Sequence, residues 1–137
     1  MPDETAPYHP LYLEGIELFN QQEFFACHDV LEELWTETLS EEREFYQGLI
    51  QAAVALFHFG EGNLGGARRL CDSSCRYLEP YRPQCLGLDL EEFLAAFRDC
   101  FANLLAVNSG WPAGVVLDPA RIPVIVLSPG AGDSPAE

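Results

Sequence analysis

His28 and Glu32 are the candidate site residues of this chain, because an imidazole and a carboxylate can bind a metal ion or transfer a proton. Side chains four residues apart share one face of an α-helix, so an imidazole and a carboxylate would lie one turn apart. The same side of the helix carries Phe24, Leu31 and Trp35, which predicts partly apolar surroundings. Because burying an ionised carboxylate is costly unless it is paired, hydrogen-bonded or bound to a metal, this pair is the candidate site.

A second polar stripe lies on the most apolar segment of the chain. No charged residue occurs from position 48 to position 57, which predicts a central helix that is buried on nearly all sides. One face of this helix carries Gln47, Gln51 and His58, whose polar groups need hydrogen-bond partners when buried. The natural partners are His28 and Glu32, on an antiparallel neighbouring helix.

Ligand chemistry leads to a metal hypothesis for His28, Glu32 and His58. Two imidazole nitrogens and a carboxylate suit a divalent ion such as zinc, manganese or iron, with open positions for water. Gln47 and Gln51 would hydrogen-bond these ligands from behind. In this hypothesis the metal lowers the pKa of a bound water, and the protein is a metal-dependent hydrolase. The sequence holds no second copy of the motif that would complete a two-metal site.

Two other interpretations of the same cluster stay open. One is a small-ligand pocket without metal. The other is a hydrogen-bonded core network, in which Glu32 accepts from His28, His58 or a glutamine amide and fixes the register of the helices. The protein would then be a non-catalytic structural or interaction protein, and the apolar segment 122–127 would support assembly with another copy. Trp35 is expected in the core in every case.

Composition and charge narrow the classes of partner. The chain has 137 residues, with 22 acidic against seven basic residues and a net charge of −15. This acidic balance argues against binding to nucleic acid or to an anionic membrane, because both need clustered basic residues. No apolar run approaches the length of a membrane span, so no membrane partner is expected.

The cysteines predict a reducing compartment. There are five, with no C-x-x-C pair and no export signal at the N-terminus, so free thiols in the cytoplasm are the simplest interpretation. Most are expected to be small core residues. Cys71 and Cys75 are four apart, which places them close together on one face of a helix.

The hydrophobic pattern predicts an all-α fold, a compact array of about five helices. Residues 1–9 are expected to be a flexible lead-in, 10–107 the helical domain, and 108–137 a Pro/Gly-rich, extended tail whose last ten residues are disordered. Start signals are Asn20, Ser40 and the capping box of Asp89 with Glu92. The expected helices are 10–20, 21–38, 40–60, 63–79 and 89–107.

Several motifs, in order and spacing, resemble the DUF309 family over roughly residues 14–105. The resemblance implies a small all-helical domain of uncharacterised function whose H-x-x-x-E-x-x-W motif is suspected of binding metal, in a group sometimes described as metal-dependent hydrolases. It also adds Asn63 to the residues expected around the site, with Trp35, Gln47 and Gln51. The matching motifs are His28-x-x-x-Glu32-x-x-Trp35, Phe45-x-x-Gly48-Leu49-Ile50-Gln51-x-Ala53, His58, Gly62-Asn63 and Gly66-Ala67.

Overall fold

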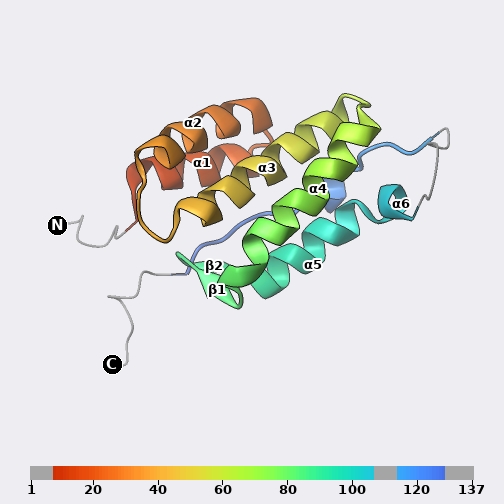
Figure 1. Ribbon diagram of the computed structural model, residues 1–137. Helices are drawn as coiled ribbons and strands as arrows, with labels where there is room; N and C mark the ends of the chain where they lie inside the picture. The colour runs from red at the N-terminus through yellow and green to blue at the C-terminus, as the bar shows by residue number, and fades with distance from the viewer. Residues whose placement is uncertain (1–7, 107–113, 129–137) are drawn as a thin grey trace.

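The computed structural model describes residues 8–106 and 114–128, and it confirms the predicted all-α fold (Figure 1). Within these residues the chain forms six α-helices, a two-stranded antiparallel hairpin and two short 3-10 turns, Glu79–Tyr81 and Pro119–Arg121. The helices are α1 (Pro10–Asn20), α2 (Phe24–Glu37), α3 (Arg43–Gly60), α4 (Leu64–Leu78), α5 (Leu90–Cys100) and α6 (Ala102–Leu105). The strands are β1 (Gln84–Cys85) and β2 (Leu88–Asp89).

Helix α3 is the centre of the fold, as its uncharged sequence predicts. The pair α1 and α2 packs on one side of α3, α4 packs on another, and α5 lies beyond α4 (Figure 1). Ten of its eighteen residues are buried, and three alanines, Ala52, Ala53 and Ala55, are completely inaccessible. Within the part of the chain that the structure describes, no helix is both long enough and apolar enough to cross a membrane.

Small residues let the helix backbones approach closely. A Cβ placed on Gly48 of α3 would lie 2.7 Å from the Leu78 side chain of α4. At the same position, the Ser74 hydroxyl of α4 donates a buried hydrogen bond of 2.9 Å to the Gly48 carbonyl oxygen. Gly15 has the same role between α1 and α2, where a Cβ would lie 2.5 Å from Leu31. Gly15 therefore packs helices together and does not interrupt α1.

Of the three predicted capping residues, one is confirmed and two are wrong, while α1 begins at Pro10 as predicted. Asp89 caps α5 as predicted, because its carboxylate accepts a 3.0 Å hydrogen bond from the Glu92 amide. Ser40 does not cap α3, which begins at Arg43, and the Ser40 hydroxyl instead contacts the Glu42 carboxylate. Asn20 does not cap α2 either, because it is the last residue of α1 and its side chain is used elsewhere.

The amide of Asn20 holds the C-terminal segment against the bundle. Its Nδ2 donates to the Ile125 carbonyl oxygen and its Oδ1 accepts from the Ile125 amide, both at 2.8 Å. The side chain therefore hydrogen-bonds both the backbone N–H and the backbone C=O of Ile125, as a neighbouring strand would. Ile122 and Ile125 are buried, and residues 123–128 run as coil over the helices. The predicted extended segment at 122–127 is thus packed on its own chain.

The expected helix 89–107 is two helices, because the chain turns at Phe101. The Phe101 amide bonds to both the Phe97 and Arg98 carbonyl oxygens, which tightens the end of α5 before α6 begins. The hairpin before α5 was not predicted, and it turns through Leu86 and Gly87, both with positive φ. The predictions for residues 1–7, 107–113 and 129–137, which include most of the lead-in and the last residues of the tail, concern residues outside those that the structure describes.

Candidate functional site

The two predicted histidines line one pocket on the face between α2 and α3. Its volume is about 130 Å³. We call it the His28/His58 pocket. Every other side chain that lines the pocket is apolar, and almost all of its exposed wall is apolar, so the pocket is a hydrophobic hollow with two imidazoles in its lining. The lining residues are Phe24, Phe25, His28, Val54, Phe57 and His58.

Helical spacing on both elements builds this pocket. Phe24 and His28 are one turn apart on α2, and Val54 and His58 are one turn apart on α3, so each helix presents one apolar residue and one imidazole. The rings of Phe25 and Phe57 meet across the two helices with their centroids 5.7 Å apart. This ring contact borders the pocket, and Phe25 itself is 60% exposed.

Carboxylates hold the imidazole of His28 on its outer side. Its Nδ1 lies 3.1 Å from an oxygen of Asp29, and its Nε2 lies 3.5 Å from an oxygen of Glu32. Carboxylate oxygens only accept hydrogen bonds, so a neutral imidazole can donate to one of them and an imidazolium to both. The side chain of His28 is 25% exposed, against 61% for Asp29 and 54% for Glu32.

The cap of α4 fixes the tautomer of His58. Asn63 is the N-cap of α4, and its Oδ1 accepts a 3.1 Å hydrogen bond from the Gly66 amide. This bond orients the amide so that its Nδ2 faces His58, 3.3 Å from Nδ1. An NH₂ group donates, so Nδ1 of His58 accepts and a neutral His58 carries its proton on Nε2. Asn63 therefore sets the hydrogen-bonding role of the His58 imidazole from outside the pocket lining.

The predicted burial of Glu32 is wrong. Its side chain is 54% exposed, and among residues 8–106 and 114–128 its ion-pair partner is His28, 3.5 Å away. The premise of a buried carboxylate that must be neutralised therefore fails. The hydrogen-bonded core network proposed around Glu32 is not what the described residues form.

Trp35, Gln47 and Gln51 lie apart from the pocket lining. Trp35 is half-buried, packs against the core and carries the Arg43 guanidinium over its ring at 3.9 Å. Its Nε1 and the Oε1 of Gln51 are buried without a hydrogen-bond partner among the described residues. Gln47 is half-buried on α3. The structure places His28 and His58 in one pocket lining, with Glu32 and Asn63 beside them, and leaves Trp35, Gln47 and Gln51 outside it.

Sequence reasoning missed the hydrophobic members of the site. Phe25 and Phe57 were not assigned to it, although each lies within three residues of a predicted histidine. Phe24 lies on the predicted side of its helix, and the spacing of four from Phe24 to His28 and from Val54 to His58 is the available signal. Asp29 is exposed to solvent and contacts the adjacent His28.

The described side chains do not assemble the three-ligand metal centre. Within residues 8–106 and 114–128, no three His, Cys, Asp or Glu side chains are grouped so that they could hold a metal ion. His9 does not join His28, because it caps α1 through the Leu11 amide and lies 3.6 Å from Glu37. As it stands, the donor set does not fit a divalent ion held by His28, Glu32 and His58.

Fold and pocket together define a small all-α domain with a mixed apolar and imidazole pocket between its second and third helices. Residues 12–70, which contain the whole pocket, match the family described as "Domain of unknown function (DUF309)". The resemblance inferred from the motifs is therefore confirmed over residues 12–70.

Two curated relatives are uncharacterised proteins. The chain is 34% identical over 97 residues to the uncharacterized protein YpuF of Bacillus subtilis (strain 168), a match that covers 69% of this chain and 56% of YpuF. It is 46% identical over 54 residues to an uncharacterized protein of Aquifex aeolicus (strain VF5), covering 39% of this chain and 16% of that protein. The chain thus spans about half of one relative and a small part of the other.

Proposed function

We propose that the His28/His58 pocket binds a small, largely apolar molecule that carries one polar group. The observation that carries this proposal is the shared lining, in which two imidazoles are the polar members of an otherwise hydrophobic wall. Ligand sites commonly have this composition, with apolar side chains supplying affinity and a few polar groups fixing orientation. Exposure of Phe25 at the rim leaves the pocket accessible from solvent.

Volume limits the size of the ligand. A dry apolar cavity of about 150 Å³ in another protein binds benzene or xenon, and this pocket is close to that size at about 130 Å³. The ligand is therefore a single aromatic ring or a short branched chain, or it is a larger molecule that inserts such a group. Its polar group would be a hydroxyl, carbonyl or carboxylate that meets His28 or His58.

Filling the pocket should remove binding. We expect phenol to bind the parent protein with a dissociation constant in the millimolar range, about −4 kcal/mol, and to shift the NMR signals of His28, Phe57 and His58. In Val54→Phe, the larger side chain occupies the pocket, so the affinity should fall at least tenfold. Leu39→Phe is the matched control, because Leu39 is 91% exposed and does not line the pocket.

The polar half of the proposal is tested with toluene, which has nearly the shape of phenol without its hydroxyl. Phenol should bind several-fold more tightly than toluene, since one hydrogen bond contributes about 0.5–1.5 kcal/mol. The difference should shrink when His28→Leu and His58→Leu are tested one at a time, and the variant that abolishes it identifies the anchor. Equal affinity for both probes in all three proteins would show a purely hydrophobic pocket and contradict the anchoring role.

A divalent metal held by His28, Glu32 and His58 is the second candidate. Its support is the presence of two imidazoles in one pocket, and binding would require Glu32 to move in beside them, because the described side chains do not group three ligands. The test is metal content by mass spectrometry, on protein purified without chelator, beside Glu32→Gln. Near-stoichiometric metal that is lost in Glu32→Gln would support this candidate and justify a hydrolase screen. Parent protein without metal would leave the organic ligand as the function of the pocket.

We also propose that the protein works in a reducing compartment such as the cytoplasm. All five cysteines are free thiols in the structure, and four of them are buried. Trapping the thiols with an alkylating reagent in intact cells should find them reduced; finding them as disulfides would contradict this placement.

A further inference from the structure

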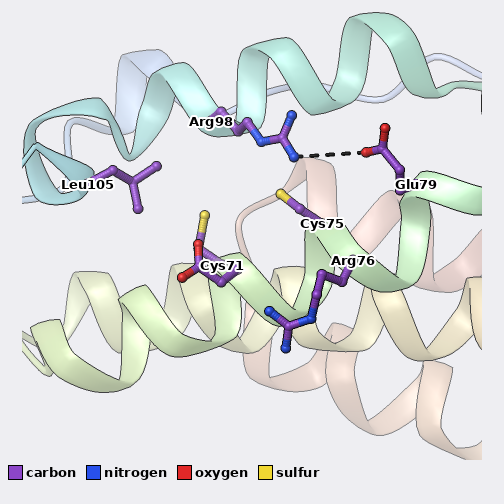
Figure 2. Close-up of a pocket in the computed structure, with 7 residues that line it drawn as sticks. Cys71, Cys75, Arg76, Glu79, Arg98 and Leu105 are labelled. Atoms are coloured by element: carbon purple, nitrogen blue, oxygen red, sulfur yellow. Dashed lines mark ion pairs between the residues drawn. The ribbon is translucent and has the colours of Figure 1, made fainter.

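A second pocket, distinct from the His28/His58 pocket, lies between α4 and the helices α5 and α6. It has a volume of about 240 Å³ and is open to solvent. We call it the thiol pocket. Figure 2 shows the thiols of Cys71 and Cys75 on the side of α4 that faces α5, with Arg98 of α5 beside Cys75. The lining residues are Cys71, Asp72, Cys75, Arg76, Glu79, Arg98 and Leu105.

The two cysteines of this pocket are not equivalent. Cys71 donates a hydrogen bond to the sulfur of Cys75, and the Arg98 guanidinium also hydrogen-bonds that sulfur. Hydrogen bonding from Cys71, and then the charge of Arg98, lower the pKa of Cys75 to about 7 in spite of its burial. The same hydrogen bond, together with burial, raises the pKa of Cys71. Because the Arg98 guanidinium lies beside Cys75, Cys75 is the sulfur whose ionised form the cation favours, with the Cys71 thiol as its neighbour.

Other charged side chains around the thiol pocket have smaller effects on the pKa of Cys75. Asp72 on α4 opposes ionisation of Cys75. Glu79 competes for Arg98, with 3.9 Å between the closest atoms, and this ion pair is marked in Figure 2. The Arg76 side chain points away from both sulfurs. Arg98 is therefore the cation that faces the thiolate, and it reaches Cys75 from a different helix.

We propose that Cys75 is a nucleophilic thiol that exchanges with low-molecular-weight disulfides, which makes the thiol pocket a site of reversible S-thiolation. The Cys75 sulfur attacks one sulfur of the disulfide and forms a new S–S bond. The S–S bond of the reagent breaks, and its electron pair leaves on the second sulfur, which takes a proton from water. Cys75 is oxidised to a mixed disulfide while half of the reagent is reduced to a thiol.

The pocket supplies the access that this step needs. Cys71 and Cys75 are only 1% and 5% exposed, so a reagent reaches the sulfur through the thiol pocket and not along the surface of α4. Cys71 keeps its proton and positions the thiolate as a hydrogen-bond donor. After the first exchange, Cys71 is the neighbouring thiol that attacks the mixed disulfide and releases the adduct.

The other cysteines provide an internal comparison. Burial raises the pKa of Cys27 to about 12 and that of Cys85 and of Cys100 to about 11. Cys85 is the most exposed of the five, so access alone would make it react first. At pH 7 the larger thiolate fraction of Cys75, offset in part by its lower intrinsic nucleophilicity, favours Cys75 over Cys85 by on the order of 10²-fold before access is considered.

The experiment uses the full chain and dithiodipyridine, a neutral low-molecular-weight disulfide. Short reactions across a pH series are quenched and the modified cysteine is located by peptide mass spectrometry. We expect Cys75 to be modified first, with a rate that rises through about pH 7 and then levels off. Modification of Cys85 before Cys75, or a Cys75 rate that still rises at pH 9 like that of an ordinary buried thiol, would overturn the proposal.

Variants test the role of Arg98. Arg98→Gln should move the midpoint of the Cys75 rate profile to higher pH, because the cation that stabilises the thiolate is gone. Arg121→Gln is the matched control, since Arg121 acts on Cys100 and pairs with Asp99. Cys71→Ala should shift the Cys75 midpoint upward, and Cys71→Ser, which keeps a donor, should shift it less. An unchanged midpoint in a folded Arg98→Gln protein would contradict the thiolate pairing.

Discussion

We expect Phe97→Ala to lower the free energy of unfolding by about 3–5 kcal/mol. Phe97 is completely buried, stacks on Phe93 with ring centroids 5.5 Å apart, and contacts Phe101 at 5.0 Å. Removing the ring leaves a cavity where α5 turns into α6, and the aromatic neighbours cannot fill it. Because a domain of this size is stabilised by only about 5–15 kcal/mol, the loss is a large part of the total.

Phe25→Ala is the matched control for this prediction, because it removes the same ring from a site that is 60% exposed. Its cost should be less than about 1 kcal/mol. Urea denaturation followed by circular dichroism measures both variants. Equal losses for Phe97→Ala and Phe25→Ala would mean that the cluster around α5 contributes no more than the surface, which would contradict the described core.

Gly48→Ala is the second substitution expected to have a large effect. Adding one methyl group places it 2.7 Å from the Leu78 side chain and 3.1 Å from the Cβ of Tyr77. Leu78 is completely buried and cannot move away, so α3 and α4 must separate. The expected cost is about 1–3 kcal/mol, the usual range for overpacking a core. The better helix propensity of alanine offsets only part of it.

Two further proteins isolate the cause of that cost. Gly65→Ala should be neutral or stabilising by up to about 1 kcal/mol, because its Cβ would meet only the Arg69 guanidinium at 3.7 Å. In the double variant Gly48→Ala with Leu78→Ala, the new methyl group enters the space that the leucine leaves, so the loss in unfolding free energy should be smaller than the sum of the single losses. Strict additivity would show that the collision with Leu78 is not what destabilises Gly48→Ala.

The helices could be predicted because their signals are local. The uncharged run at 48–57 indicated the buried central helix, and the capping box at Asp89 marked the start of α5. The use of Asn20 could not be predicted, because its partner Ile125 is 105 residues away in the sequence. The hairpin before α5 is too short for an alternating pattern to show.

The incorrect prediction that Glu32 is buried shows what helical periodicity cannot decide. The buried residues of α2, Phe24, Cys27, Leu31 and Leu34, define the centre of its inner face. At about 100° per residue, His28 lies about 80° from that centre and Glu32 about 120° from it. His28 is therefore at the boundary and Glu32 is outside. The sequence alone places both on one side of the helix, and the width of the contact with α3 decides which of them is buried.

A crystal structure with para-bromophenol would locate the ligand site directly. The bromine atom gives an anomalous signal that locates the ring without ambiguity. We expect a peak in the His28/His58 pocket, with the ring against Phe25 and Phe57 and the hydroxyl within hydrogen-bond distance of an imidazole nitrogen. A protein that binds the compound only elsewhere, for example in the thiol pocket, would contradict the claim that this pocket is the ligand site.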